Sequence, residues 1–266
     1  SEGGYGSQRL ASYYADYWAG VGPMAGGEPL KNAPVENCAN LAFSFLTGAM
    51  DEGFYRNKLT GYTKTAFDSL QAKYAGRLMN HSADSLFRHR IELIPNCGHS
   101  IDYSLTTPWL KTYKRNPYPH TFMWEDYPMD GQRRQGFYNL HVIQRPKAAD
   151  GLKDASGEDR DYYEMDIKDN VIRLSVKKVT YQTLERDPVY GIDLKFTKSY
   201  HPASGGKWKI YLNDQLVDMN RPVTVFINNR KAFEGKLVPR MEDMITSCME
   251  YFDPCRVFSA SVDVVL

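Results

Sequence analysis

Three side chains of this sequence, a serine, an aspartate and a histidine, have the types and the order needed for nucleophilic catalysis. Ser1 is followed by Asp51 and then by His99. A serine hydroxyl attacks a carbonyl carbon efficiently only when a base removes its proton, and a carboxylate must hold that base in the right tautomer. We therefore interpret Ser1 as a nucleophile, His99 as its base and Asp51 as the acid that orients the base.

The residues around Ser1 are those of a tight turn that leads into a helix. Gly3 and Gly4 follow the serine two and three places later, where small residues let a helix pack closely and leave the hydroxyl exposed. The N-terminus of that helix would stabilise negative charge on the reacting oxygen, and the N–H of Glu2 would donate to it. We predict that Glu2 supplies one donor of an oxyanion hole.

Two other acids compete with Asp51 for the contact with His99. Glu52 is its direct neighbour, and Asp102 follows the histidine so closely that we expect it to cap the next helix instead. The other histidines lack metal-ligand spacing on a helix, and the four scattered cysteines lack the paired spacing of a zinc site. We therefore expect no metal and no cofactor.

The first part of the chain alternates between helices and short apolar strands. Apolar stripes over residues 10–18 and 59–70 predict two helices. Residues 19–25, 41–46 and 90–94 are predicted to be strands, because each is an apolar run closed by glycine or proline. This alternation predicts a parallel α/β sheet, whose working residues lie beyond the carboxyl ends of the strands. The three candidate residues occupy such positions.

The character of the sequence changes near residue 117. Beyond it apolar and polar residues alternate, which is typical of strands with one buried face. We predict two domains, an α/β part in residues 1–116 and a smaller β-rich accessory domain in residues 117–266.

The β-rich part is predicted in more detail from the same alternation. Asp169-Asn170 and Asn228-Asn229 supply hairpin turns, because asparagine tolerates left-handed backbone. Residues 145–160 and 198–207 are expected to be exposed loops, and residues 241–248 a late helix. Strands are predicted at 137–143, 162–167, 171–176, 192–196, 208–212, 223–227, 231–237 and 257–264.

Composition narrows the range of partners. Lys and Arg number 33 against 32 Asp and Glu, and no basic run is interleaved with aromatic residues, so nucleic acid is not an expected partner. No stretch approaches the roughly 20 apolar residues of a membrane span, so no membrane is expected either. The 42% of hydrophobic residues are enough for large cores.

Several segments resemble serine esterases of the α/β-hydrolase fold, and the order serine, aspartate, histidine is the order of that family. In the first half the similar segments are Ser1–Gly4, Gly22–Gly27, Gly48–Asn57 and Pro95–His99. The closest likeness is to bacterial esterases with a β-rich extension, similar here at Pro108–Leu110, Trp124–Glu125, Phe137–Tyr138 and Leu216–Val225. The resemblance implies a partial α/β-hydrolase sheet from the nucleophile onward, followed by an accessory domain.

The resemblance also implies an incomplete unit. The glycine before the serine, the early sheet strands and the loop that gives the second oxyanion N–H do not occur in this chain. Three parallel strands alone would leave an apolar edge exposed, so we expect an upstream N-terminal segment of the same protein as a partner. Without it, residues 1–266 are expected to be inert. The implied substrate is a small-molecule or carbohydrate ester, and the implied location is secreted or periplasmic.

Three other functions stay open at this stage. A serine peptidase of the prolyl-oligopeptidase type shares the triad order, but such enzymes usually end at the hydrolase domain. Ser1 could also be an N-terminal nucleophile that uses its own α-amino group as base, although such nucleophiles begin a strand. In a non-catalytic binding module, the β-rich half would recognise a carbohydrate or a protein partner.

Overall fold

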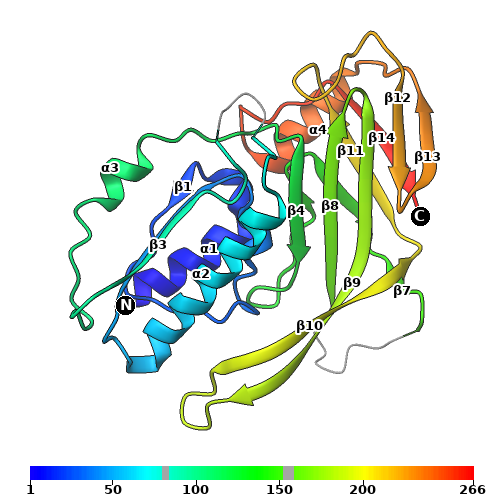
Figure 1. Ribbon diagram of the computed structural model, residues 1–266. Coiled ribbons are helices and arrows are strands. Elements are labelled where there is room, and N and C mark those ends of the chain that lie inside the picture. Colours follow the sequence, from blue (N-terminus) through cyan, green and yellow to red (C-terminus); the bar gives the residue numbers. More distant parts are fainter. Residues whose placement is uncertain (80–83, 152–158) are drawn as a thin grey trace. The chain divides into compact units, whose positions relative to one another are not determined.

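The structure is a computed structural model that describes residues 1–79, 84–151 and 159–266 (Figure 1). The described chain is a mixed α/β protein with more strands than helices. Within these three ranges no helix is both long enough and apolar enough to cross a membrane.

The chain divides into two compact units. The first contains residues 1–116 and 181–197, and the second contains residues 117–180 and 198–266. The chain thus leaves the first unit after residue 116, where the composition changes. It comes back to that unit at residues 181–197, and nothing in the sequence predicted this. The second unit also has as many residues as the first, whereas we expected it to be smaller.

The sheet of the first unit has three parallel strands in the order β1 (Gly20–Val21), β2 (Ala42–Gly48) and β3 (His89–Ile94). They lie where the sequence predicted strands, and the predicted parallel pairing is confirmed. β2 is buried along its whole length, because a central parallel strand is covered on both faces. The carboxyl ends of the strands meet at one edge of the sheet.

Two main helices cover this sheet, α1 (Glu2–Tyr13) and α2 (Arg56–Lys73). The helix predicted over 59–70 is confirmed, whereas α1 begins eight residues before the predicted stripe of 10–18 and ends at Tyr13. On α2 the ring of Phe67 lies 4.6 Å from the ring of Phe43 on β2, which anchors the helix to the central strand. The shorter helical segments are η1 (Ala15–Tyr17), η2 (Val35–Cys38), η3 (Gly53–Tyr55) and α3 (Thr106–Leu110).

The backbone of α1 touches the segment that follows β1, and glycine permits the contact. A methyl group at Gly4 would overlap the carbonyl oxygen of Met24, and one at Gly26 would lie 2.7 Å from the carbonyl carbon of Gly4. Gly3, in contrast, has no atom within 4 Å of where its methyl group would be. The packing role predicted for Gly4 is therefore confirmed, whereas that predicted for Gly3 is wrong.

The second unit contains one helix, α4 (Met241–Tyr251), and two mainly antiparallel sheets. Residues 181–186 of β9 and 193–197 of β10 belong to the first unit. Strands of one sheet are β4 (Thr121–Asp126), β7 (Lys147–Ala148), β8 (Arg160–Lys168), β9 (Val171–Arg186), β10 (Asp193–Ser204), β12 (Val223–Ile227) and β13 (Arg230–Gly235). The other sheet consists of β5 (Gly136–Phe137), β6 (Leu140–Gln144), β11 (Lys207–Leu212) and β14 (Ala260–Val265).

Aromatic side chains from the two sheets form the core of the second unit. Trp124 of β4 stacks on Phe137 of β5 with 5.3 Å between ring centroids, and Tyr163 of β8 meets Trp208 of β11 edge to face. Because all four rings are almost fully buried, the sheets pack face to face. The expectation of a β-rich part with its own core is confirmed.

In this unit the predicted hairpin turns are confirmed, whereas a polar strand was wrongly predicted to be a loop. Asp169, Asn170, Asn228 and Asn229 all have positive φ, as their hairpin turns require. Residues 198–207 are not a loop, because β10 runs through most of them as a polar strand. β4 was not predicted, and residues 152–158 of the other expected loop lie outside the described residues.

The contact at Gly4 gives a stability prediction with a matched control. Gly4→Ala should lower the free energy of unfolding by about 1–3 kcal/mol, because the added methyl group forces the helix away from the 24–26 segment. Gly3→Ala adds the same methyl group to open space, so it should change stability by less than about 1 kcal/mol. Urea denaturation measures both, and equal losses would contradict the proposed backbone contact.

Candidate active site

Ser1 lies at the carboxyl edge of the three-stranded sheet. Met24 bridges to Leu46 in parallel fashion and the N–H of Ala25 donates to the Leu46 carbonyl, so the chain continues the line of β1. The backbone nitrogen of Ser1 donates to the carbonyl oxygen of Ala25 at 2.7 Å. Ser1 is thereby fixed at the end of the strand and at the start of α1.

Asp51 is held in the turn that joins β2 to α2. Its N–H donates to the carbonyl of Gly48, and its own carbonyl accepts from the N–H of Asn57. The side chain of Asn57 donates to the carbonyl of Ala49 and closes the turn from the other side. The Asp51 carboxylate is 4% exposed and is directed by a backbone with little freedom to move.

His99 is carried by the loop after β3, which lies directly against the end of β2. The N–H of Ala49 donates to the Ile94 carbonyl, and the N–H of Met50 donates to the Cys97 carbonyl. A methyl group at Gly48 would overlap the carbonyl oxygen of Gly98. Only glycine at position 48 allows the histidine loop to come this close to the acid.

The structure brings Ser1, His99 and Asp51 into one line of contacts. The Oγ of Ser1 contacts the Nε2 of His99, and the Nδ1 of His99 lies 2.7 Å from the Oδ2 of Asp51. Because an ionised carboxylate can only accept, Nδ1 must carry the ring proton, which leaves Nε2 free to accept the serine proton. This tautomer is the one that a general base at His99 needs.

The rival acids do not take this position. The carboxylate of Asp102 accepts the N–H of Ser104 at 2.9 Å and closes a local turn, which lowers the pKa of Asp102. The expectation that it caps the next helix is wrong, because α3 begins only at Thr106. Glu52 is exposed and begins the single turn of η3.

One residue of the site was not singled out from the sequence. Arg56, the first residue of α2, donates from Nη1 to the Oδ1 of Asp51 at 3.0 Å, so the carboxylate contacts a cation on one oxygen and His99 on the other. Its guanidinium also lies 5.0 Å from the centre of the Phe54 ring. The signal was an arginine shortly after the acid and at a helix start, a pattern that many surface arginines share.

The start of α1 provides donors beside the serine. The first N–H groups of an α-helix have no partner within the helix, and here these include the N–H of Glu2.

The contacts of Ser1 also distinguish His99 from the α-amino group of Ser1 as the base. The Ser1 hydroxyl contacts the His99 ring, while the Ser1 backbone nitrogen donates to carbonyl oxygens of Met24 and Ala25. These contacts favour His99 as the base.

Two pockets adjoin Ser1. A pocket of about 620 Å³ includes His99, Ile101 and Tyr103 in its lining, and one of about 680 Å³ includes Tyr5, Phe54, Arg56 and Ile192. Gly3 lines both, and its lack of a side chain leaves room beside the serine. We call them the histidine-side pocket and the arginine-side pocket.

Comparison with known proteins adds no further evidence. No family model, no curated protein and no solved structure matches this chain. In the part of the chain that the structure describes, no group of three or more His, Cys, Asp or Glu side chains could hold a metal ion. Function is therefore inferred from the contacts of Ser1, His99 and Asp51 and from the pockets around them.

The contact between His99 and Asp51 can be tested without any assumption about activity. A ring proton that a histidine donates to a buried carboxylate gives a strongly downfield proton resonance. We expect this signal in the full-length protein and expect it to disappear in Asp51→Asn. Asp102→Asn is the matched control and should keep the signal, whereas its loss there would transfer the contact to Asp102.

Proposed function

We propose that this protein is a serine hydrolase that cleaves carboxylic esters through a covalent acyl-enzyme. The observation that carries the proposal is the continuous contact from the Ser1 hydroxyl through His99 to the buried Asp51 carboxylate. The same residue types in this arrangement activate serine in unrelated protein folds. The resemblance of the sequence to serine esterases supports the same reaction.

In the first half of the proposed reaction, the Oγ of Ser1 bonds to the carbonyl carbon of the ester while its proton passes to Nε2 of His99. The carbonyl oxygen becomes an anion, which the Glu2 N–H at the helix start stabilises. When this intermediate collapses, the bond from carbon to the alcohol oxygen breaks and His99 gives its proton to the departing alcohol. The products are an acyl-serine and a free alcohol.

In the second half, water repeats the same steps from the other direction. His99 takes a proton from water, the hydroxide oxygen bonds to the acyl carbon, and the bond to Ser1 Oγ breaks as that oxygen takes the proton back from His99. Asp51 stays ionised throughout and stabilises the imidazolium. The acid product leaves and the serine is restored.

We also propose that the three strands of the first unit are part of an α/β-hydrolase sheet. That fold requires parallel strands and a helix that begins at the serine, and both are present here. It also requires the acid and the histidine to follow successive strands, as Asp51 and His99 do. The contact between Gly4 and the 24–26 segment supports the same proposal, because the nucleophile turn needs a helix that packs closely.

Labelling with a fluorophosphonate tests the proposed nucleophile, since only an activated serine reacts quickly. In the full-length protein the label should map to Ser1. Ser1→Ala should abolish labelling and lower ester hydrolysis by roughly six orders of magnitude, because the acyl-enzyme can no longer form. Ser7→Ala is the matched control: Ser7 lines the histidine-side pocket, but its hydroxyl donates to the Gly3 carbonyl.

The outcomes separate the competing functions. Labelling of another serine, or undiminished hydrolysis by Ser1→Ala, would refute the assignment. Faster cleavage of peptide anilides than of 4-nitrophenyl esters would favour a peptidase. A full-length protein with neither labelling nor hydrolysis would favour a binding module.

Arg56 gives a separate prediction about the acid. Arg56→Gln should lower kcat for 4-nitrophenyl acetate by about 10-fold to 100-fold, the effect of losing one hydrogen bond to a charged group, because Asp51 then holds His99 less firmly. Arg56→Lys should recover part of this loss, since an ammonium group can still reach the carboxylate. A kcat unchanged in Arg56→Gln would show that Asp51 does not depend on it.

A further inference from the structure

The turn between β9 and β10, residues 187–192, is closed by its own hydrogen bonds. The N–H of Asp187 donates to the Ile192 carbonyl at 2.8 Å, and the N–H of Gly191 donates to the Asp187 carbonyl at 2.9 Å. The Asp187 carboxylate accepts the N–H groups of Val189 and Tyr190. These bonds fix the position of Ile192 relative to the two strands.

This turn is attached to the loop that carries the proposed acid. The hydroxyl of Tyr55 donates to the Oδ1 of Asp187 at 2.9 Å, and the ring of Phe54 lies 4.5 Å from the ring of Tyr190. The N–H of Tyr190 and the Tyr55 hydroxyl hold the pKa of Asp187 below its ordinary value, so the carboxylate is an ionised acceptor at neutral pH. The turn is thus held directly beside η3.

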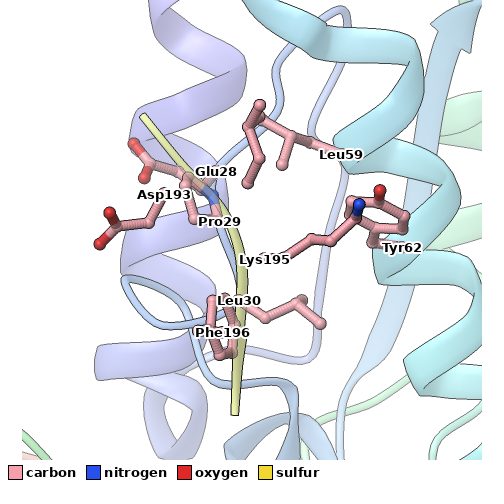
Figure 2. A pocket seen from close by; sticks show the side chains of 9 residues that line it. Glu28, Pro29, Leu30, Leu59, Tyr62, Asp193, Lys195 and Phe196 are labelled. Atoms are coloured by element: carbon pink, nitrogen blue, oxygen red, sulfur yellow. The ribbon is translucent and has the colours of Figure 1, made fainter. Parts of the chain in front are cut away.

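The start of β10 packs on other parts of the first unit as well. Leu194 is buried, and a cavity of about 240 Å³ lies between residues 28–30, the α2 side chains Leu59 and Tyr62, and residues 193–196 of β10. Figure 2 shows the side chain of Lys195 reaching from β10 toward α2, which carries Leu59 and Tyr62. The amino group of Lys31 lies 3.7 Å from the Asp193 carboxylate. The segment is therefore seated by several contacts besides those of the turn.

The turn places Ile192 in the wall of the arginine-side pocket, beside Ser1. The rest of that wall includes the aromatic rings of Tyr5 and Phe54, and its charged residues are Glu2 and Arg56. The charge of Arg56 is already paired with Asp51, so the pocket does not offer a free positive charge to an anionic group. Glu2 repels an anionic group as well, and the surfaces of Tyr5, Phe54 and Ile192 suit an apolar or aromatic group.

The direction of the proposed reaction decides which part of the ester lies in this pocket. His99 gives its proton to the departing alcohol, so the alcohol must leave on the side of His99, which is the histidine-side pocket. The acyl group then extends to the other side of Ser1. We propose that the arginine-side pocket binds the acyl group and that Ile192, carried by the β9–β10 turn, selects bulky apolar or aromatic acyl groups. This inference rests on the proposed function.

A pair of substrates with one leaving group tests it. The full-length protein should cleave 4-nitrophenyl phenylacetate with a kcat/KM about 10-fold or more above that for 4-nitrophenyl acetate, because the apolar pocket stabilises the ring. Ile192→Trp narrows the pocket beside Ser1 and should lower this ratio by about 10-fold, and Ile192→Ala should shift it by less. Ile101→Trp is the matched control, because it makes the same change in the histidine-side pocket and should leave the ratio unchanged.

Binding of phenylacetamide, measured by ligand-observed NMR, separates this inference from the proposed function. If the protein cleaves esters but the ratio is near one, or falls equally in Ile101→Trp, the acyl assignment is overturned. If it cleaves no ester, the proposed function fails. In that case phenylacetamide binding that is lost in Ile192→Trp, but kept in Ile101→Trp, still supports an aromatic subsite, and binding unaffected by Ile192→Trp overturns it.

Discussion

The structure of the site depends on one buried negative charge, the carboxylate of Asp51. A carboxylate with 4% of its side chain exposed is stable in ionised form only when its oxygens are paired, because burial removes the water that would solvate it. Arg56 takes one oxygen and His99 the other. The acid therefore ties together the end of β2, the start of α2 and the loop after β3, and Gly48 lets that loop come within reach.

The parts of this arrangement that follow from local periodicity could be predicted from the sequence. The helix after the acid and the three strands each have an apolar pattern over several residues, although only β2 is buried along its whole length. Once they are ordered along the chain, Asp51 and His99 fall beyond strands that end at a common edge, and Ser1 begins the helix there. Their meeting was predictable because parallel strands leave few alternatives for residues that follow them.

The parts that depend on distant contacts could not be predicted in this way. The end of β9 carries polar side chains on both faces, and the strand predicted at 192–196 gave no sign of where it would pack. Contacts with distant residues place this segment, including those of Tyr55 and Phe54 with the turn. Arg56 was missed for a related reason. An arginine at a helix start becomes part of a site only when the fold places a buried carboxylate beside it.

The loop between Asp51 and α2 connects the proposed acid to the proposed acyl pocket. Phe54 and Tyr55 are consecutive residues with positive φ, a conformation that costs about 1–2 kcal/mol for each residue with a side chain. The ring contact with Tyr190 and the hydrogen bond to Asp187 offset that cost. Arg56 follows directly, so the backbone that these contacts hold in place also delivers the guanidinium to Asp51. Loss of the turn contacts would free the loop, and it would loosen the wall of the pocket and the hold on the acid together.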